Sequence, residues 1–285
     1  NMDKYKKHIM GDASEEPMPL YIIPDRKVSL ADVREGMRNH YEGTELSMTN
    51  DPGAGVYKVP YRWRPMTFKS EGREYFNERA IATQQTGFVL IAQMRSWLPD
   101  AVGGILWFGV DDANTAVLTP MYTSITEIPE CYRRGNGSMT EFSWTSAFWI
   151  HNWVANMAYN RYEPMIRDIR PVQKELEDSY VDLVKDADAR ALELYKADPA
   201  KASAFLTQLC AKVANETTAR WKKLGEYLLV KYMDGNVKKE KDGKFEENGY
   251  GQIVSPNFPG YSQEYYDQVA KSGEAKHLEV PKKDK

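Results

Sequence analysis

The fold of this chain is decided by residues 77–112, which read NERAIATQQTGFVLIAQMRSWLPDAVGGILWFGVDD. The stretch holds two apolar runs of strand length, residues 87–94 and 104–110, linked through the short turn WLPD. Consecutive strands with so short a link pair as antiparallel neighbours. Four polar residues precede the first run: Thr83, Gln84, Gln85 and Thr86. Because a core strand needs only its apolar residues, we expect these polar side chains to line a cleft whose floor is the sheet.

Turn signals and apolar runs extend this sheet in both directions. Further strands are predicted at residues 81–84 and 116–121, and a short edge strand at residues 20–23. Ser29 is a suitable N-cap for a helix over residues 30–40.

Helical patterns follow the glycine turn at residues 135–137. The sequence predicts an aromatic-rich helix over residues 143–162, a second helix from a first-turn Pro171 to about residue 195, and a third from Asp198 to about residue 233. Sheet first and helices afterwards indicate an α+β fold. We therefore divide the chain into a sheet-rich part (1–139), a helical region packed on it (140–234) and an extended C-terminal tail (235–285).

Composition limits the partners of this chain. It has 285 residues, 42% of them hydrophobic, and a net charge of −3, so it has no basic field to attract nucleic acid. No segment reaches the ~20 apolar residues of a membrane span, because polar side chains interrupt the closest candidate at residues 142–159. The basic N-terminal residues are followed by no apolar run, so they are not a signal peptide, and the compartment stays open.

Most common catalytic chemistries lack their motif in this sequence. The four histidines are scattered, so no metal site and no cofactor are predicted. There is no P-loop, no GxGxxG and no GxSxG, and NDPGAG at residues 50–55 is a turn. Cys131 and Cys210 lie far apart, and we expect both to be buried structural thiols.

Arginines and aspartates near the strands are candidate binding residues. The guanidinium groups of Arg62, Arg64 and Arg79 present a donor fork that suits a carboxylate or an oxyanion. Asp111, directly after the second strand, could bind a substrate amine. Alternatively, the arginines are surface residues or stack on Tyr61 and Trp63, and Asp111 and Asp112 form a turn.

Several blocks in order resemble one known family: YRWRP (61–65), NERAIATQQTGFVLIAQMRSWLP (77–99), GGILWFGVDD (103–112), TPMY (119–122) and FSWTSAFWIHNWVANMAYNRYEPMI (142–166). From about residue 19 onward, the chain resembles the C-terminal half of the bacterial cysteine dipeptidases of the dipeptidase A type. These are N-terminal-nucleophile hydrolases related to penicillin V acylase and bile salt hydrolase. The resemblance implies that the chain contributes part of a four-layer αββα sandwich.

The family's mechanism uses a Cys exposed as the first residue of the mature chain. Its thiol is the nucleophile, and its own α-amine, which titrates near 8, is the base. Residue 1 here is Asn, and neither cysteine is near it. We therefore expect the nucleophile on a segment outside this chain, or on a separate chain, and expect this chain alone to be inactive. The missing N-terminal half is the implied partner, and a homo-oligomer is also considered.

The resemblance implies a catalytic role for Arg79, which precedes a strand and would stabilise the charged transition state. A dipeptide offers one carboxylate and one amine. On chemical grounds Arg62 or Arg64 would bind the carboxylate, and Thr83, Thr86 or Asp111 would face the amine.

Two alternatives keep part of this interpretation. The same fold could serve an acylase that acts on N-acyl amides resembling penicillin V or bile salts. The chain could also be a non-enzymatic binding module that uses its aromatic clusters, which include Trp63, Trp144 and Trp149. Dipeptide preference, oligomeric state and compartment do not follow from the sequence.

Overall fold

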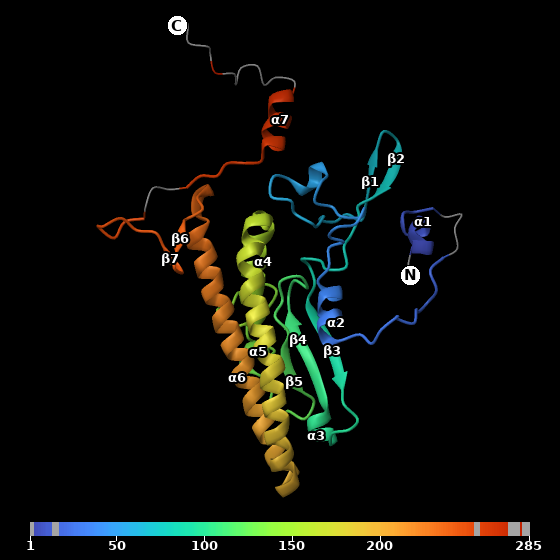
Figure 1. The fold of residues 1–285 in the computed structure, drawn as a ribbon, viewed down its shortest axis with the longest axis vertical. Helices are drawn as coiled ribbons and strands as arrows, with labels where there is room; N and C mark the ends of the chain where they lie inside the picture. Colours follow the sequence, from blue (N-terminus) through green and yellow to red (C-terminus); the bar gives the residue numbers. More distant parts are fainter. Residues whose placement is uncertain (1–2, 13–16, 254–256, 273–279, 281–285) are drawn as a thin grey trace.

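A computed structural model describes residues 3–12, 17–253, 257–272 and 280 of the chain. It combines small antiparallel sheets with long helices that follow them in the sequence (Figure 1). The predicted α+β class is therefore confirmed.

The central sheet has three antiparallel strands in the order β3-β4-β5. They are β3 (Phe88–Met94), β4 (Gly104–Val110) and β5 (Thr119–Tyr122). The register places Phe88 opposite Val110. The two predicted runs are therefore neighbouring strands, with the one-turn helix α3 (Asp100–Gly103) between them. In β3 only Val89 and Ile91 are buried, so one face of this edge strand packs on the core.

Three predicted strand segments differ in the structure. Residues 81–84 form no strand: residues 81 and 82 are a bend, and residues 83–86 form a turn in which the Thr86 amide and hydroxyl both donate to the Thr83 carbonyl. Residues 116–118 are irregular and β5 begins at Thr119, since the Asp112 carboxylate and carbonyl hold residues 115 and 116 in a turn. Residues 20–23 form no strand and are exposed.

The long helices are α4 (Ala147–Asn160), α5 (Tyr162–Ala197) and α6 (Pro199–Lys231). Only Asp198 separates α5 from α6, so the two form a long antiparallel hairpin, and α4 also packs on α6 (Figure 1). The prediction that Pro171 begins a helix was wrong, because α5 begins at Tyr162 and continues through the proline. Pro171 is exposed, so its ring lies on the solvent face of a helix whose other face is packed.

One hydrophobic core joins the sheet to these helices. Trp107 of β4, Ile150 of α4, Ile169 of α5, and Leu206 and Trp221 of α6 are all almost fully buried. Burial of side chains of this size stabilises the fold by roughly 1.5–3 kcal/mol each. The packing fixes the end of β4 against α4, which is where the candidate site lies.

Helix α2 (Leu30–Met37) begins at the predicted cap and is shorter than predicted. The Ser29 hydroxyl accepts from the Asp32 amide, and the Asp32 carboxylate accepts from the Ser29 amide, which is a complete capping box. The smaller elements are η1 (Asp3–Tyr5), α1 (Lys6–Ile9), η2 (Pro52–Ala54), β1 (Thr67–Ser70), β2 (Arg73–Phe76), η3 (Glu130–Tyr132), η4 (Met233–Gly235), β6 (Glu240–Lys241), β7 (Lys244–Phe245) and α7 (Gln263–Lys271). Of the helices in the described residues, none is long and apolar enough to span a membrane.

Candidate functional site

Of the predicted site residues, Asp111 lies directly after the C-terminal end of β4, and the turn that contains Thr83 and Thr86 ends beside it at Gly87. Asp111 follows the last residue of β4 and adopts a left-handed conformation with φ of 68°. Its amide donates to the Gly87 carbonyl at 2.9 Å, directly before β3. A non-glycine residue in this conformation must be held by its surroundings, because the conformation costs about 1–2 kcal/mol.

The Asp111 carboxyl group is buried and only half satisfied. The residue is 2% exposed, and its Oδ1 accepts from Asn152 Nδ2 of α4 at 2.9 Å. Its Oδ2 has no hydrogen-bond partner among the described residues. The pKa of Asp111 is raised to about 7, mainly by burial and to a smaller extent by the neighbouring Asp112 carboxylate, while the hydrogen bonds from the Asp112 backbone and from Asn152 oppose the rise. The structure therefore holds a carboxyl group with one free acceptor position and a proton that is labile near neutral pH.

A chain of amides connects Asp111 to the polar turn before β3. Gln84 Nε2 donates to Asn156 Oδ1 at 3.2 Å, and Asn156 Nδ2 donates to Asn152 Oδ1 at 2.8 Å. Asn152 in turn donates to Asp111. Thr83 and Thr86 belong to the same turn, with their hydroxyl oxygens 3.1 Å apart. Both threonine side chains are half-buried, so the turn places them beside this chain of amides.

Arg79 is held on the other side of the same turn. With its oxygen turned toward them, the Gln85 amide accepts from Tyr61 Oη at 3.0 Å and from Arg79 Nη1 at 3.1 Å. Burial raises the pKa of Tyr61, whereas the charges of Arg79 and Arg64 lower it and that of Asp112 raises it. All three charges therefore act on the Tyr61 hydroxyl.

Arg62 and Arg64 have different surroundings. The Arg62 guanidinium donates to the carbonyls of Val59 and Tyr61, each at 2.9 Å, and also contacts Asp51. These partners occupy it within the loop that precedes Tyr61. Arg64 is exposed, and its charge reaches Tyr61 from the outside. Of the two predicted carboxylate-binding arginines, Arg64 is the one whose side chain faces solvent.

A buried polar network lies behind Asp111. The Asp112 carboxylate accepts from the Tyr159 hydroxyl at 3.0 Å and from the Thr115 hydroxyl at 2.8 Å. Tyr159 Oη also lies 3.2 Å from His40 Nε2, and Asn114 Nδ2 lies 3.1 Å from His40 Nδ1. Burial raises the pKa of Asp112, and His40 opposes the rise. His40, Asn152 and Asn156 were not among the predicted site residues. The i, i+4 spacing of the two asparagines was the one local signal for them.

An aromatic hollow of about 330 Å³ begins next to Asp111. Val110, the residue before Asp111, lines it together with Trp149 of α4, which lies three residues before Asn152 on the same helix face. Other apolar walls are Phe108, Tyr132 and Phe148. The hollow is large enough for one large amino-acid side chain, and its polar lining residues, which include Arg133, Arg134 and Ser146, come from outside β4.

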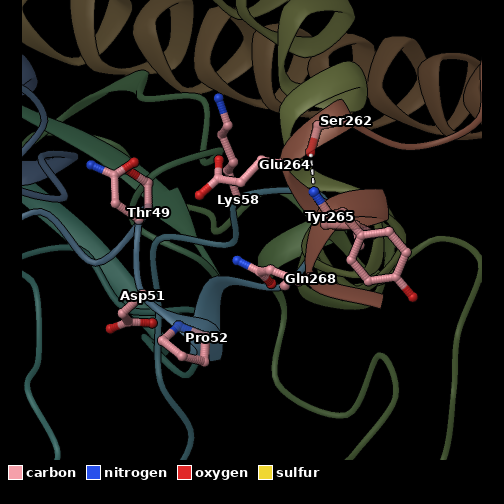
Figure 2. A pocket seen from close by; sticks show the side chains of 11 residues that line it. Thr49, Asp51, Pro52, Lys58, Ser262, Glu264, Tyr265 and Gln268 are labelled. Atoms are coloured by element: carbon pink, nitrogen blue, oxygen red, sulfur yellow. Dashed lines mark hydrogen bonds between the residues drawn. The ribbon is translucent and has the colours of Figure 1, made fainter. Parts of the chain in front are cut away.

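A second hollow, of about 250 Å³, lies between residues 49–58 and α7. Its labelled side chains include Asp51, Lys58, Glu264 and Gln268, and the Tyr265 amide donates to the Ser262 hydroxyl at its edge (Figure 2). It is lined by no thiol and by none of the residues around Asp111, so we do not assign acyl-transfer chemistry to it.

Neither cysteine has the surroundings of a nucleophile. Cys131 and Cys210 are buried, and burial raises the pKa of both thiols, that of Cys210 to about 11. Cys210 Sγ donates to the Pro120 carbonyl and accepts from the Tyr122 amide, each at 3.4 Å. Such thiols are not ionised at neutral pH. The described part of the chain also contains no group of three or more residues suited to hold a metal ion.

Curated proteins similar to this chain are named as dipeptidases. The chain is 28% identical over 172 residues to "Probable dipeptidase B" of Lactococcus lactis, which is 58% of this chain and 31% of that protein. It is 26% identical over 220 residues to "Probable dipeptidase" of Latilactobacillus sakei, covering 75% and 41%. It is 22% identical over 172 residues to "Dipeptidase A" of Lactobacillus helveticus, covering 60% and 30%. The chain thus spans less than half the length of each.

The sequence also matches a family as a whole. Residues 2–175 match peptidase family C69, and this range includes β3, β4, β5, α4 and every residue of the cluster around Asp111. The match covers more than half of the 285 residues. The chain therefore belongs to peptidase family C69.

Proposed function

We propose that this chain forms the substrate pocket of a cysteine dipeptidase, whose nucleophile is the N-terminal Cys of a segment outside these residues. The observation that carries the proposal is the half-satisfied, buried Asp111 carboxyl at the end of β4, in a chain that belongs to peptidase family C69. The dipeptidase names of the similar proteins and the unsuitable surroundings of Cys131 and Cys210 support it.

The reaction transfers an acyl group twice. The Cys α-amine takes the thiol proton, and the thiolate attacks the carbonyl carbon of the dipeptide. The tetrahedral intermediate breaks its C–N bond, the leaving amine takes the proton, and a thioester remains. The leaving amine departs, and water then enters. The Cys α-amine deprotonates this water, which attacks the thioester and releases the first amino acid, and the proton returns to the cysteine sulfur. The developing charge needs fixed donors, and Arg79 is the proposed one.

The ends of the substrate are assigned by charge. The α-ammonium group of the dipeptide binds the free acceptor position of Asp111, and its charge keeps that carboxyl ionised. Arg64, at the exposed edge, binds the α-carboxylate. Thr83 and Thr86 supply hydroxyl contacts near the amine. Arg62 keeps the loop before Tyr61 in place and contributes to substrate binding through that loop.

A substrate panel tests this proposal on the complete protein with its N-terminal Cys exposed. We expect hydrolysis of unblocked dipeptides, none after Cys→Ala replacement of the nucleophile, and none by the 285-residue chain alone. Hydrolysis of N-acyl amides without hydrolysis of dipeptides would identify an acylase instead. Full activity of the 285-residue chain would show that the nucleophile lies within it and overturn the proposal.

A further inference from the structure

A groove of about 410 Å³ between α2 and α5 concentrates positive charge. Arg34 and Arg38 line it from α2, and Arg170 and Lys174 line it from α5. Glu177 lies at its base. The groove is separate from the aromatic hollow and shares no residue with the cluster around Asp111.

Among the described residues that line the groove, Glu177 is the only buried carboxylate. Glu177 is 1% exposed, and Arg38 binds it with two hydrogen bonds of 2.9 and 3.1 Å. The Leu118 amide donates to the same carboxylate at 3.0 Å. Arg34 reaches it as an ion pair with Nη1 at 3.4 Å. The acceptor positions of Glu177 are therefore largely filled before Arg34 is satisfied.

The other charged residues of the groove do not neutralise its excess positive charge. Arg170 donates to two uncharged acceptors, the Asn114 carbonyl at 2.6 Å and Gln173 Oε1 at 2.7 Å. The remaining carboxylates belong to Glu35 and Asp178, whose side chains are 72% and 53% exposed, and Glu35 pairs with Arg38 at 3.3 Å from this exposed position. Asp178 already pairs with Lys174 and lies 4.0 Å from Arg34. The interior of the groove thus keeps more positive than negative charge.

Several donors in this interior have no acceptor. Arg34 is only 8% exposed, yet its Nε and Nη1 have no hydrogen-bond partner among the described residues, and neither has Arg38 Nε. The ion pair of Arg34 Nη1 with Glu177 offsets only part of the cost of burying donors that make no hydrogen bond. An acceptor that enters the adjoining space would reduce the remaining cost. A guanidinium fork is matched best by an oxyanion with two acceptor oxygens.

We propose that the groove between α2 and α5 binds a small oxyanion, a phosphate or a carboxylate, through Arg34 and Arg170. The bound anion neutralises the excess charge and pairs the free donors of Arg34. It also ties α2 to α5. The Arg38 carbonyl, next to the end of α2, accepts from Asn114 Nδ2 at 2.6 Å, so the occupied groove would hold the residues that support the His40–Asp112 network.

Thermal unfolding and calorimetric titration of the full 285-residue chain test the proposal. Inorganic phosphate and acetate are added separately, each against sodium chloride of equal ionic strength. We expect one or both oxyanions to raise Tm beyond chloride and to bind with a measurable Kd. Stabilisation by phosphate alone identifies a phosphate site, and stabilisation by both identifies a general oxyanion site.

Variants connect the effect to the groove. Arg34→Met should fold, because Arg38 still pairs with Glu177, and should weaken oxyanion binding roughly tenfold or more. Arg170→Met provides a second variant from the opposite wall. Arg167→Met is the matched control, because Arg167 lies on the same helix, is exposed and pairs with Glu163 outside the groove.

Two results would overturn the proposal. The first is that neither oxyanion stabilises the chain more than chloride does. The second is that Arg34→Met and Arg170→Met both bind the oxyanion as tightly as Arg167→Met. Because neither readout depends on hydrolysis, failure of this proposal is distinguishable from failure of the proposed dipeptidase function.

Discussion

At the scale of single residues, Asp111 is the position where local structure and chemistry coincide. The left-handed backbone turns its carboxyl under the end of β4, and the burial that holds it there also raises its pKa to about 7. The backbone conformation is held by the hydrogen bond from the Asp111 amide to the Gly87 carbonyl. In the proposed site, the ammonium group of the substrate would pair with the buried carboxyl and offset its desolvation.

Replacement of Asp111 by Asn should make stability less dependent on pH. The pKa of Asp111 rises from 3.8 when unfolded to about 7 when folded, so the folded state retains a proton that the unfolded state loses between these values. Wild-type stability therefore falls across this pH range, by up to about 4 kcal/mol from this group. Asp111→Asn should gain stability relative to wild type as pH rises from 4 to 7. Denaturant unfolding at several pH values measures the unfolding free energies of wild type and variant. If the difference between them did not change with pH, the raised pKa of Asp111 would be contradicted.

Replacement of Arg79 and replacement of Arg64 should change different kinetic constants of the complete enzyme. If Arg79 stabilises the transition state, Arg79→Ala should lower kcat about 10²- to 10³-fold with little change in Tm. Arg64→Ala should instead mainly raise KM, because the proposed role of this exposed side chain is to bind the substrate carboxylate. Steady-state kinetics and thermal unfolding of both variants decide this. A large loss of Tm with normal kcat in Arg79→Ala would make Arg79 structural.

At the scale of elements, the loop after η3 must pack closely on α4 to form the aromatic hollow. Gly137 has φ of +81°, and a Cβ there would lie 2.9 Å from Trp149 Cδ1. Gly135 has φ of +92° and nothing within 4 Å of the same position. Comparison of substitutions at Gly135 and Gly137 therefore distinguishes the cost of backbone strain from the cost of a steric clash.

Gly137→Ala should destabilise the protein more than Gly135→Ala. Both changes place alanine in a left-handed conformation, which costs about 1 kcal/mol. Only Gly137→Ala also pushes against Trp149, for a further cost of about 1–3 kcal/mol. Denaturant unfolding of the two variants measures the difference. Equal losses of stability would mean that the loop does not lie against α4 as described.

Pro171→Ala should stabilise the protein. The proline lies inside α5, where it lacks the N–H that a helix interior uses and its ring opposes the preceding turn. Alanine restores a hydrogen bond to the residue 167 carbonyl, and no packing is lost because Pro171 is exposed. We expect a gain of about 1–3 kcal/mol in unfolding free energy. A lower unfolding free energy for the variant would contradict this. It would mean that proline stabilises the protein, by packing of its ring or by restricting the unfolded chain, more than the restored hydrogen bond does.

Sequence patterns predicted those elements whose residues decide their own structure. The apolar runs of β3 and β4 and the Ser29 cap have strong local signals, and both were found. Pro171 was misread as a helix start, because its local preference is overridden by the packing of α5 against α6. Residues 81–84 were misread as a strand, since the hydrogen bonds of Thr86 to Thr83 are not visible in hydrophobicity.

The candidate site was predictable only in part for a similar reason. Asp111 and Arg79 could be selected because each adjoins a predicted strand. Asn152 and Asn156 join Asp111 only through the packing of α4 on the sheet, and His40 reaches Asp112 only through Tyr159. Such neighbours are far apart in sequence, so no local pattern could identify them.

At the scale of the whole molecule, this chain of peptidase family C69 has two separate polar regions. The end of β4 brings together a buried carboxyl, an anchored arginine and an aromatic hollow, while the groove between α2 and α5 carries unsatisfied positive charge. The first set suits the two ends and one side chain of a dipeptide. The second set forms the groove for which we propose oxyanion binding.

The most direct test compares kcat/KM for an unblocked dipeptide and its N-acetyl counterpart, using the complete protein and its Asp111→Asn variant. If Asp111 binds the substrate ammonium group, wild type should strongly prefer the unblocked dipeptide, and the variant should lose most of that preference. Equal turnover of the two substrates by wild type would contradict recognition of a free amine at the end of β4.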